Sequence, residues 1–205
     1  MKYYELTTLK TVIFGAGAAS PGIQEYLNAP EAKGTLLGAW FADIGSLNEV
    51  YLLRSFDSME DLVAERQRAI LSDNPFGCLE QLVNYYSDTY LPFDFLPEVE
   101  SGEFGKVYEV RTYHTKLNGM APTIEKWREA IPARVAMSKM NIAMYALDGS
   151  PRFTQIWPYD SANHRAEVRA QSVSDGVWPP KGGPDWLSTD MKSTLAIPMP
   201  FSPLK

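Results

Sequence analysis

The chain has one cysteine, Cys78, and two histidines, His114 and His164, among its 205 residues. A single cysteine cannot form an intramolecular disulfide, so we expect a reducing cytoplasm and a buried structural thiol. The two histidines fall in different predicted elements, and neither has an acidic or cysteine partner at metal-ligand spacing. The sequence therefore favours neither a zinc nor a haem site, and we expect no metal and no cofactor.

Long apolar runs and blocks of like charge are also missing. The sequence contains no apolar stretch of about eighteen residues, the length that a membrane-spanning helix needs. Residues 1–6 have strand composition and lack the apolar core of a signal peptide. The net charge is −6, with acids and bases interspersed. This pattern argues against nucleic acid and against an anionic membrane surface as partners.

One pattern occurs twice, in residues 37–58 and again in residues 141–161. Each copy is an apolar run, a Gly-Ser turn, a second apolar run and an aromatic-Asp-Ser triplet. The turn glycines, Gly45 and Gly149, are 104 residues apart, whereas the closing triplets are 103 apart. The chain is therefore expected to consist of two repeated units, the second with a turn one residue shorter. We place the boundary near Ser101, giving domains 1–100 and 101–205.

Each unit is predicted to follow the order β-α-β-β-α-β. Strands are expected at residues 3–9, 37–44, 49–56, 81–91, 107–113 and 193–199 and in a hairpin at 141–159. Helices are expected from Ser20-Pro21, from a cap at Asp57 or Ser58, over 123–137 with a kink or break at Pro132, and over 161–172. This is the ferredoxin-like order, an antiparallel sheet with two helices on one face. We expect an α+β fold in which the two sheets pack face to face as one intramolecular barrel.

Several segments resemble the NIPSNAP domain family of the dimeric α+β barrel superfamily. They are Tyr4–Leu9, Leu37–Val50, Phe56–Ser58, Glu65–Arg68 and, in the second unit, Tyr108–Tyr113. The resemblance covers essentially the whole chain as two tandem copies. It departs from the family pattern where Pro151-Arg152 replaces the Leu-Asn of the turn, and where Thr7 replaces the arginine of the first strand.

What the resemblance implies is chiefly architecture. Eukaryotic members are associated with mitochondria and vesicle traffic, and bacterial members have no established reaction. Related barrels include cofactor-independent oxygenases, isomerases and haem enzymes, so the fold alone does not name a reaction.

The segment Val12–Ser20 is similar to a dinucleotide-binding fingerprint. Its third glycine is replaced by Ser20, and Pro21-Gly22 stands at the expected helix start. The next two strands form a hairpin, so the β-α-β unit that a pyrophosphate site needs is absent. We therefore expect a plain strand-to-helix connection.

Charged residues in the strands are the better candidates for a site. Alternation places Tyr108 and Val110 on one face of their strand, and Glu109 and Arg111 on the other. If the apolar set packs on helices, Glu109, Arg111 and, in the first unit, Glu5 point into the space between the sheets. There they could bind a polar ligand or form a buried ion pair without one.

Arg54 lies among apolar strand residues, at the position that matches Trp157 in the second unit. It is either a ligand contact or a structural partner for an acid such as Glu5 or Glu109. His114 is a candidate general base at the barrel mouth, with an ordinary strand-end histidine as the alternative. Further candidates for the ligand-binding lining are Trp40, Tyr113, Tyr145, Gln155 and Trp157.

Three functions are consistent with these patterns. The barrel could bind a small, partly apolar molecule, or act as a cofactor-independent monooxygenase or isomerase, or serve as a protein-interaction scaffold. In the enzyme, Arg111 would hold an anionic or enolate oxygen while Glu109 or His114 moved a proton. A wet, charged pocket favours the first two functions, and an interior filled by side chains favours the third. Homo-oligomers are expected from the remaining apolar surface.

Overall fold

The computed structural model describes residues 2–205 and contains the expected order of elements twice. The first half consists of β1 (Tyr3–Thr11), α1 (Gly15–Leu27), β2 (Thr35–Ile44), β3 (Glu49–Phe56), α2 (Met59–Leu71), the short 3-10 helix η1 (Pro75–Gly77) and β4 (Leu82–Pro92). The second half consists of β5 (Val107–Thr115), α3 (Met120–Val135), β6 (Ile142–Ala146), β7 (Arg152–Tyr159), α4 (Ala162–Ser174), η2 (Gly183–Trp186) and β8 (Leu187–Pro198).

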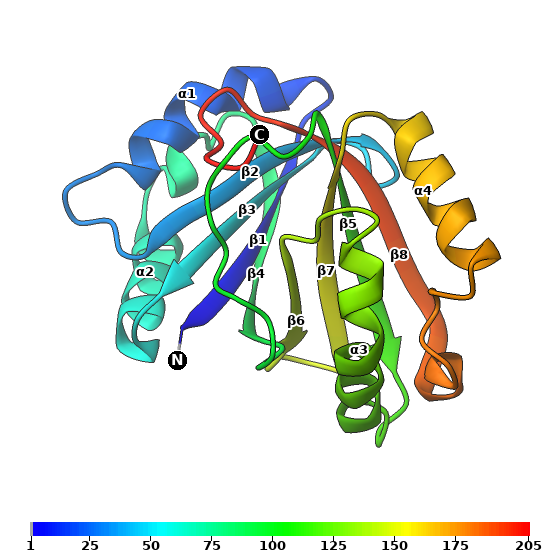
Figure 1. The fold of residues 1–205 in the computed structure, drawn as a ribbon. Helices are drawn as coiled ribbons and strands as arrows, with labels where there is room; N and C mark the ends of the chain where they lie inside the picture. The colour runs from blue at the N-terminus through cyan, green and yellow to red at the C-terminus, as the bar shows by residue number, and fades with distance from the viewer. Residues whose placement is uncertain (1) are drawn as a thin grey trace.

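The strands close into one antiparallel barrel in the order β1-β3-β2-β8-β5-β7-β6-β4. Each half contributes a four-stranded sheet, and the sheets join where β2 pairs with β8 and β4 pairs with β6. In Figure 1, α1 and α2 cover the outside of the first half, and α3 and α4 the outside of the second. The predicted α+β fold, with two ferredoxin-like units in an intramolecular barrel, is confirmed. The joins are short, because β8 pairs with β2 only over Leu195–Pro198 and β4 pairs with β6 only over Tyr90–Pro92.

The apolar strand residues that we expected to pack beneath the helices lie inside the barrel instead. Tyr108 and Val110 belong to one buried cluster with Leu6, Trp40 and Tyr51 inside the barrel. The alternate residues of each strand face the helices instead, so the predicted orientation of Glu5, Glu109 and Arg111 was wrong. Glu5 and Leu6 are both buried, as are Glu109 and Tyr108, so apolar alternation could not tell the two faces of β1 and β5 apart.

Helix boundaries differ from expectation mainly in α1. It begins at Gly15, so Ser20 and Pro21 lie inside the helix and do not start it. Burial of Ala19 and Ile23 against the sheet outweighs the local start signal. Most of the glycine-rich segment is therefore the first part of a helix, not a loop that connects a strand to one.

The helices after the two hairpins begin as predicted. Ser58 Oγ accepts a hydrogen bond from Asp61 N at the start of α2, and Ser161 Oγ accepts one from His164 N at the start of α4. Because Ser58 and Ser161 cap equivalent helices, α2 and α4 align at a separation of 103 residues. In the remaining elements, α3 continues through Pro132, and β8 begins six residues earlier than expected, at Leu187.

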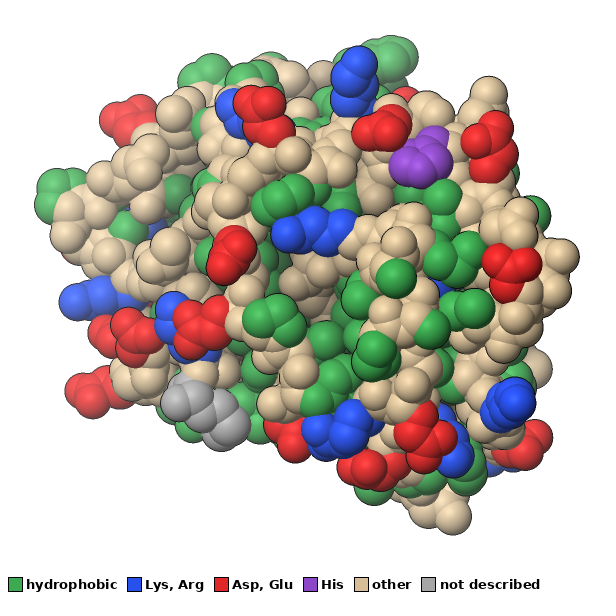
Figure 2. All heavy atoms as spheres, in the orientation of Figure 1, with side chains coloured by type: hydrophobic (Ala, Val, Ile, Leu, Met, Phe, Trp, Pro, Cys, Tyr) green, Lys and Arg blue, Asp and Glu red, His purple; other side chains and the backbone are tan. Residues whose placement is uncertain are grey.

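The surface carries both signs of charge. Figure 2 shows acidic and basic side chains interspersed over one face, with hydrophobic side chains between them. None of the helices within residues 2–205 combines the length and the hydropathy that crossing a membrane requires.

Candidate functional site

The barrel interior is filled at one end and open at the other. Tyr4, Trp40, Tyr108 and Leu204 are buried in the cluster that fills it. At the other end is a cavity of about 360 Å³. Its lining is mostly polar and consists of Leu6, Thr8, Lys10, Ser46, Glu49, Tyr51, Tyr86, Asp88, Tyr90, Val110, Thr112, His114, Arg152, Lys192 and Thr194.

Many polar groups of this mouth are already paired with one another. Arg152 Nη2 lies 2.9 Å from Asp88 Oδ1, and Tyr51 Oη donates to Glu49 Oε2 at 2.7 Å. His114 does line the mouth. Its Nδ1 lies 3.2 Å from Asp190 Oδ2 but makes no hydrogen bond within residues 2–205. The barrel mouth is therefore lined mainly by charged and hydroxyl-bearing side chains, with few aliphatic ones.

On the helix-facing side of the first half lies a complete ion-pair network. The carboxylate of Glu5 contacts Arg54 Nη2 at 2.5 Å and Arg66 Nε at 2.8 Å. The carboxylate of Glu65, from α2, contacts Arg54 Nη1 at 2.5 Å and Arg68 Nη2 at 2.8 Å. Burial would raise the pKa of Glu65, but its arginine partners outweigh burial and hold that pKa below the ordinary value.

Glu5 and Arg54 therefore pair with each other, which was the structural alternative that the sequence left open. Both side chains are almost fully buried, at 0% and 3% exposure. All four carboxylate oxygens of Glu5 and Glu65 accept hydrogen bonds. Arg54 Nε is buried without a hydrogen-bond partner, but the charges of this network are balanced by one another.

The equivalent place in the second half is built differently. Glu109 Oε1 accepts hydrogen bonds from Arg111, from Arg165 of α4, and from Ser193 Oγ at 2.6 Å. Glu109 Oε2 is buried and has no hydrogen-bond partner. Burial would raise the pKa of Glu109, but the hydrogen bond from Arg165 and the charge of Arg111 lower it overall.

A third arginine, Arg169 of α4, lies beside this cluster without a carboxylate of its own. Across residues 2–205, no acid lies within 4.0 Å of its guanidinium. Burial and the nearby guanidinium of Arg111 lower the pKa of Arg169, and Glu109 offsets them only in part. An arginine stays protonated at neutral pH even so. The carboxylate of Glu109 is thus close to three partly buried arginines, Arg111, Arg165 and Arg169.

Arg169 also lines a cavity of about 230 Å³, whose other lining residues come from α3, α4, η2 and the loop before it, and the outer face of the second sheet. Aromatic rings form much of its wall. Trp127 packs edge-on against both Phe153, at 5.2 Å between ring centroids, and Trp178, at 4.8 Å. Tyr113 completes this side, and its hydroxyl accepts a hydrogen bond from Arg111 Nε at 2.6 Å.

The remaining predicted residues fall into three places. Gln155 and Trp157 lie on the outer face of β7, where Trp157 Nε1 donates to Gln155 Oε1 at 2.7 Å. Trp40 is buried inside the barrel, and Tyr145 lines a surface groove away from both cavities. The structure thus brings Glu109, Arg111 and Tyr113 together but separates them from His114, which lies on the opposite face of β5.

Sequence reasoning missed Arg165, Arg169, Trp127 and Trp178 as members of one site. For the two arginines a signal was present, because the Ser58 and Ser161 caps align α2 with α4 at 103 residues. That alignment places Arg169 on Arg66. Trp178 comes from an irregular loop, and no local pattern indicated where its ring would lie.

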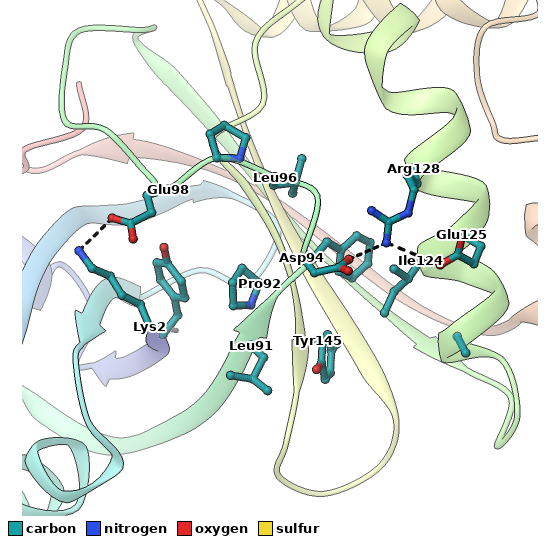
Figure 3. A pocket seen from close by; sticks show the side chains of 14 residues that line it. Lys2, Leu91, Pro92, Asp94, Leu96, Glu98, Ile124, Glu125, Arg128 and Tyr145 are labelled. Carbon is teal, nitrogen blue, oxygen red and sulfur yellow. Dashed lines mark hydrogen bonds and ion pairs between the residues drawn. The ribbon is translucent and has the colours of Figure 1, made fainter.

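The surface groove has a volume of about 550 Å³ and runs beneath the segment that links the two halves. Figure 3 shows an ion pair at each side of it, Lys2 with Glu98 at 3.1 Å and Arg128 with Asp94 at 2.8 Å. Its charged groups are satisfied by one another. The cavity beside Arg169 differs from this groove, because it combines an aromatic wall with a cation that has no ion pair within residues 2–205.

Comparisons with known proteins agree with this architecture. The Protein NipSnap homolog of Dictyostelium discoideum is 25% identical over 181 residues, which cover 86% of this chain and 78% of that protein. The crystal structure of an anthrone oxidase-like protein has a TM-score of 0.69 at 11% identity, covering 97% of this chain and 91% of the other. A “putative monooxygenase” of Lactobacillus acidophilus NCFM has a TM-score of 0.67 at 11% identity, covering 96% and 93%.

At 11% identity these two structures are similar to this chain in fold alone. The NIPSNAP family model gives the more specific result, because it matches residues 4–97 and again residues 108–203. The chain therefore belongs to the NIPSNAP family, as two tandem copies.

Proposed function

We propose that this NIPSNAP-family protein binds a small, largely apolar molecule between the second sheet and helices α3 and α4. The observation that carries the proposal is the 230 Å³ cavity walled by Trp127, Trp178 and Phe153, with one cation at its edge. Binding sites are typically concave and apolar, with a few polar groups that fix orientation. The volume lies below the range of about 300–1,000 Å³ typical for drug-sized ligands, which suits a molecule of one or two rings.

The two other hollows described above fit such a ligand less well. The barrel mouth offers hydroxyls and charges, and only Leu6 and Val110 among its lining residues are aliphatic. The groove beneath the linker has an ion pair on either side. The expectation of a ligand inside the barrel is thus replaced by a site on its outer face.

Catalysis by a cofactor-independent monooxygenase or isomerase is the second candidate. Arg111 and Arg169 could stabilise a developing oxyanion beside the cavity. A general base is harder to find, because His114 faces the barrel mouth and the lowered pKa of Glu109 makes it a weak base. Binding without turnover is therefore the better supported function.

The test is binding of a neutral one-ring probe, 2-phenylethanol, measured by ligand-observed NMR and calorimetry on the full chain. Val173 lines the cavity, so Val173→Trp should obstruct it and weaken binding about tenfold. Ile70 occupies the equivalent position of α2 and is 67% exposed, so Ile70→Trp is the matched control. Oxygen consumption in the presence of bound probe would instead favour the enzyme. Loss of binding in both tryptophan variants, or no binding by the unmodified chain, would overturn the proposal.

A further inference from the structure

We infer that the molecule bound in this cavity is a carboxylic acid with a flat apolar body, and that only the second repeat binds it. The inference rests on the proposed function and names the head group of its ligand. The two repeats have sheet–helix interfaces at equivalent positions, and these interfaces differ in their balance of charges.

The first interface is neutralised from within. Its three arginines, Arg54, Arg66 and Arg68, contact the buried carboxylates of Glu5 and Glu65. Two further acids reach the edge of the network, Asp148 at 3.7 Å from Arg66 and Glu31 at 4.0 Å from Arg68. Three cations thus meet four anions, so the charge of this interface is balanced without an added anion.

Around Glu109 the second interface has three arginines and one carboxylate. A fourth arginine, Arg134 of α3, is 2% exposed, lies over the ring of Trp157, and likewise has no acid within 4.0 Å among residues 2–205. Arg111, Arg165 and Arg169 gather around Glu109, and Arg169 lacks an ion pair of its own within the described chain. The excess is two positive charges in a place largely shielded from water, where Arg111 is 12% and Arg165 23% exposed. Uncompensated charge in such a place is destabilising unless a counter-ion joins it.

The repeat register shows how this excess arises. Val168 occupies the position of Glu65, which removes one carboxylate. Arg111 and Arg165 occupy the positions of Thr7 and Leu62, whereas Trp157 and Gln171 occupy those of Arg54 and Arg68. The number of arginines around the strand glutamate is therefore unchanged, and the second repeat has one buried carboxylate fewer. An interface with a structural role alone would be more stable with the ion pairs of the first half. Their absence in the second half indicates an interface that binds an anion at a cost in folding stability.

The guanidinium of Arg169, which has no ion pair within residues 2–205, lies at the cavity. Arg169 lines the same wall as Tyr113, whose hydroxyl already accepts a hydrogen bond from Arg111. A guanidinium can bind a carboxylate through two parallel hydrogen bonds. With its carboxylate on Arg169, a one-ring or two-ring acid would extend its body toward Trp127, Trp178 and Phe153.

Matched probes test this inference on the full chain by calorimetry. Phenylacetate and 2-phenylethanol differ in the charged group, and phenyl phosphate tests a different anion. We expect phenylacetate to bind at least about tenfold more tightly than the alcohol, the gain typical of a charge-assisted hydrogen bond. We also expect it to bind more tightly than phenyl phosphate.

Two substitutions locate the effect. Arg169→Gln should bring the affinity for phenylacetate to within about threefold of that for the alcohol, and leave binding of the alcohol unchanged. Arg66→Gln, at the equivalent position of the first repeat, should keep the preference. Val168→Glu restores the missing carboxylate, so it should weaken phenylacetate binding about tenfold and raise the unfolding temperature.

The outcomes separate the inference from the proposed function. If the alcohol binds and phenylacetate shows no preference, the inference is overturned and the cavity remains a binding site. A preference that survives in folded Arg169→Gln protein, or that disappears in Arg66→Gln, also overturns it. Stronger binding of phenyl phosphate would overturn the assignment to carboxylic acids. If no probe binds, the proposed function fails as well.

Discussion

Arg54 and Trp157 occupy equivalent positions, each directly across the sheet from the glutamate of the first strand of its repeat. Arg54 is the register partner of Glu5 in β1, and Trp157 is the register partner of Glu109 in β5. The first pair is an ion pair, whereas the second leaves Glu109 to arginines from β5 and α4. With tryptophan at this position of the second repeat, the cations that pair with Glu109 come from its own strand and from the helix α4 that borders the cavity.

The ion pairs of the first half are expected to be structural. Glu65→Gln would leave Arg68 without its buried carboxylate and Arg54 with Glu5 alone. Removing one partner of a buried pair typically costs about 3–5 kcal/mol, so we expect a loss of that size in the free energy of unfolding. Urea unfolding followed by circular dichroism measures it.

The matched control for that variant is Glu60→Gln in the same helix. Glu60 is exposed in the first turn of α2 and has no ion-pair partner within the chain from residue 2 onward. Its charge interacts with the helix N-terminus alone, which is worth about 0.3–1 kcal/mol. Equal losses in the two variants would show that the Glu65 network contributes nothing beyond its charge.

Acid should weaken the second half through Glu109. Its folded-state pKa lies below the ordinary value of 4.5, so its contribution to stability is present above that pH. The contribution is lost as the pH falls through the folded-state pKa. The difference in unfolding free energy between the wild type and Glu109→Gln should therefore shrink from pH 6 toward pH 3. A difference that stays constant over this range would contradict the lowered pKa.

Cys78 is expected to be unreactive in the folded chain. Its side chain is buried, and burial raises the pKa of the thiol to about 11. Since the thiolate is the reactive form, alkylation by iodoacetamide at pH 8 should be at least about a hundredfold slower in native than in urea-unfolded protein. Similar rates in the two states would place Cys78 at the surface.

The repeat made most of the fold predictable. Two copies of one pattern, Ser58 and Ser161 at matching helix starts, and the alternation of each strand led to two ferredoxin-like units in one barrel. The orientation of the charged strand residues could not be obtained this way. Tyr108 and Glu109 are both fully buried, on opposite faces of β5, so neither face appears as the exposed one in the sequence.

The candidate site was predictable only in part. Glu109, Arg111 and Tyr113 were identified because charged and aromatic residues alternated along one strand. Trp178 comes from a loop whose position depends on tertiary packing alone. Arg169 looks like an ordinary surface helix residue until α4 is aligned with α2 and Val168 is seen to replace Glu65.

Alanine in place of Gly38 and alanine in place of Gly17 are expected to change the stability of the chain in opposite directions. Gly38 lies in β2 against the ring of Trp40, and a Cβ added there would be 2.0 Å from Trp40 Cη2. Trp40 is fully buried in the barrel and cannot move aside, so Gly38→Ala should cost about 3 kcal/mol of unfolding free energy.

Gly17, in the segment similar to a dinucleotide fingerprint, has no atom within 4 Å of an added Cβ. It lies inside α1, where alanine is the better helix former, so Gly17→Ala should stabilise the chain by about 0.5 kcal/mol. Thermal unfolding of both variants beside the wild type measures these effects. If Gly17→Ala destabilised the chain or abolished binding of a nucleotide, the helical role of this segment would have to be abandoned. If Gly38→Ala were neutral, Trp40 would have room to move, and the closed end of the barrel would be less tightly packed than the structure shows.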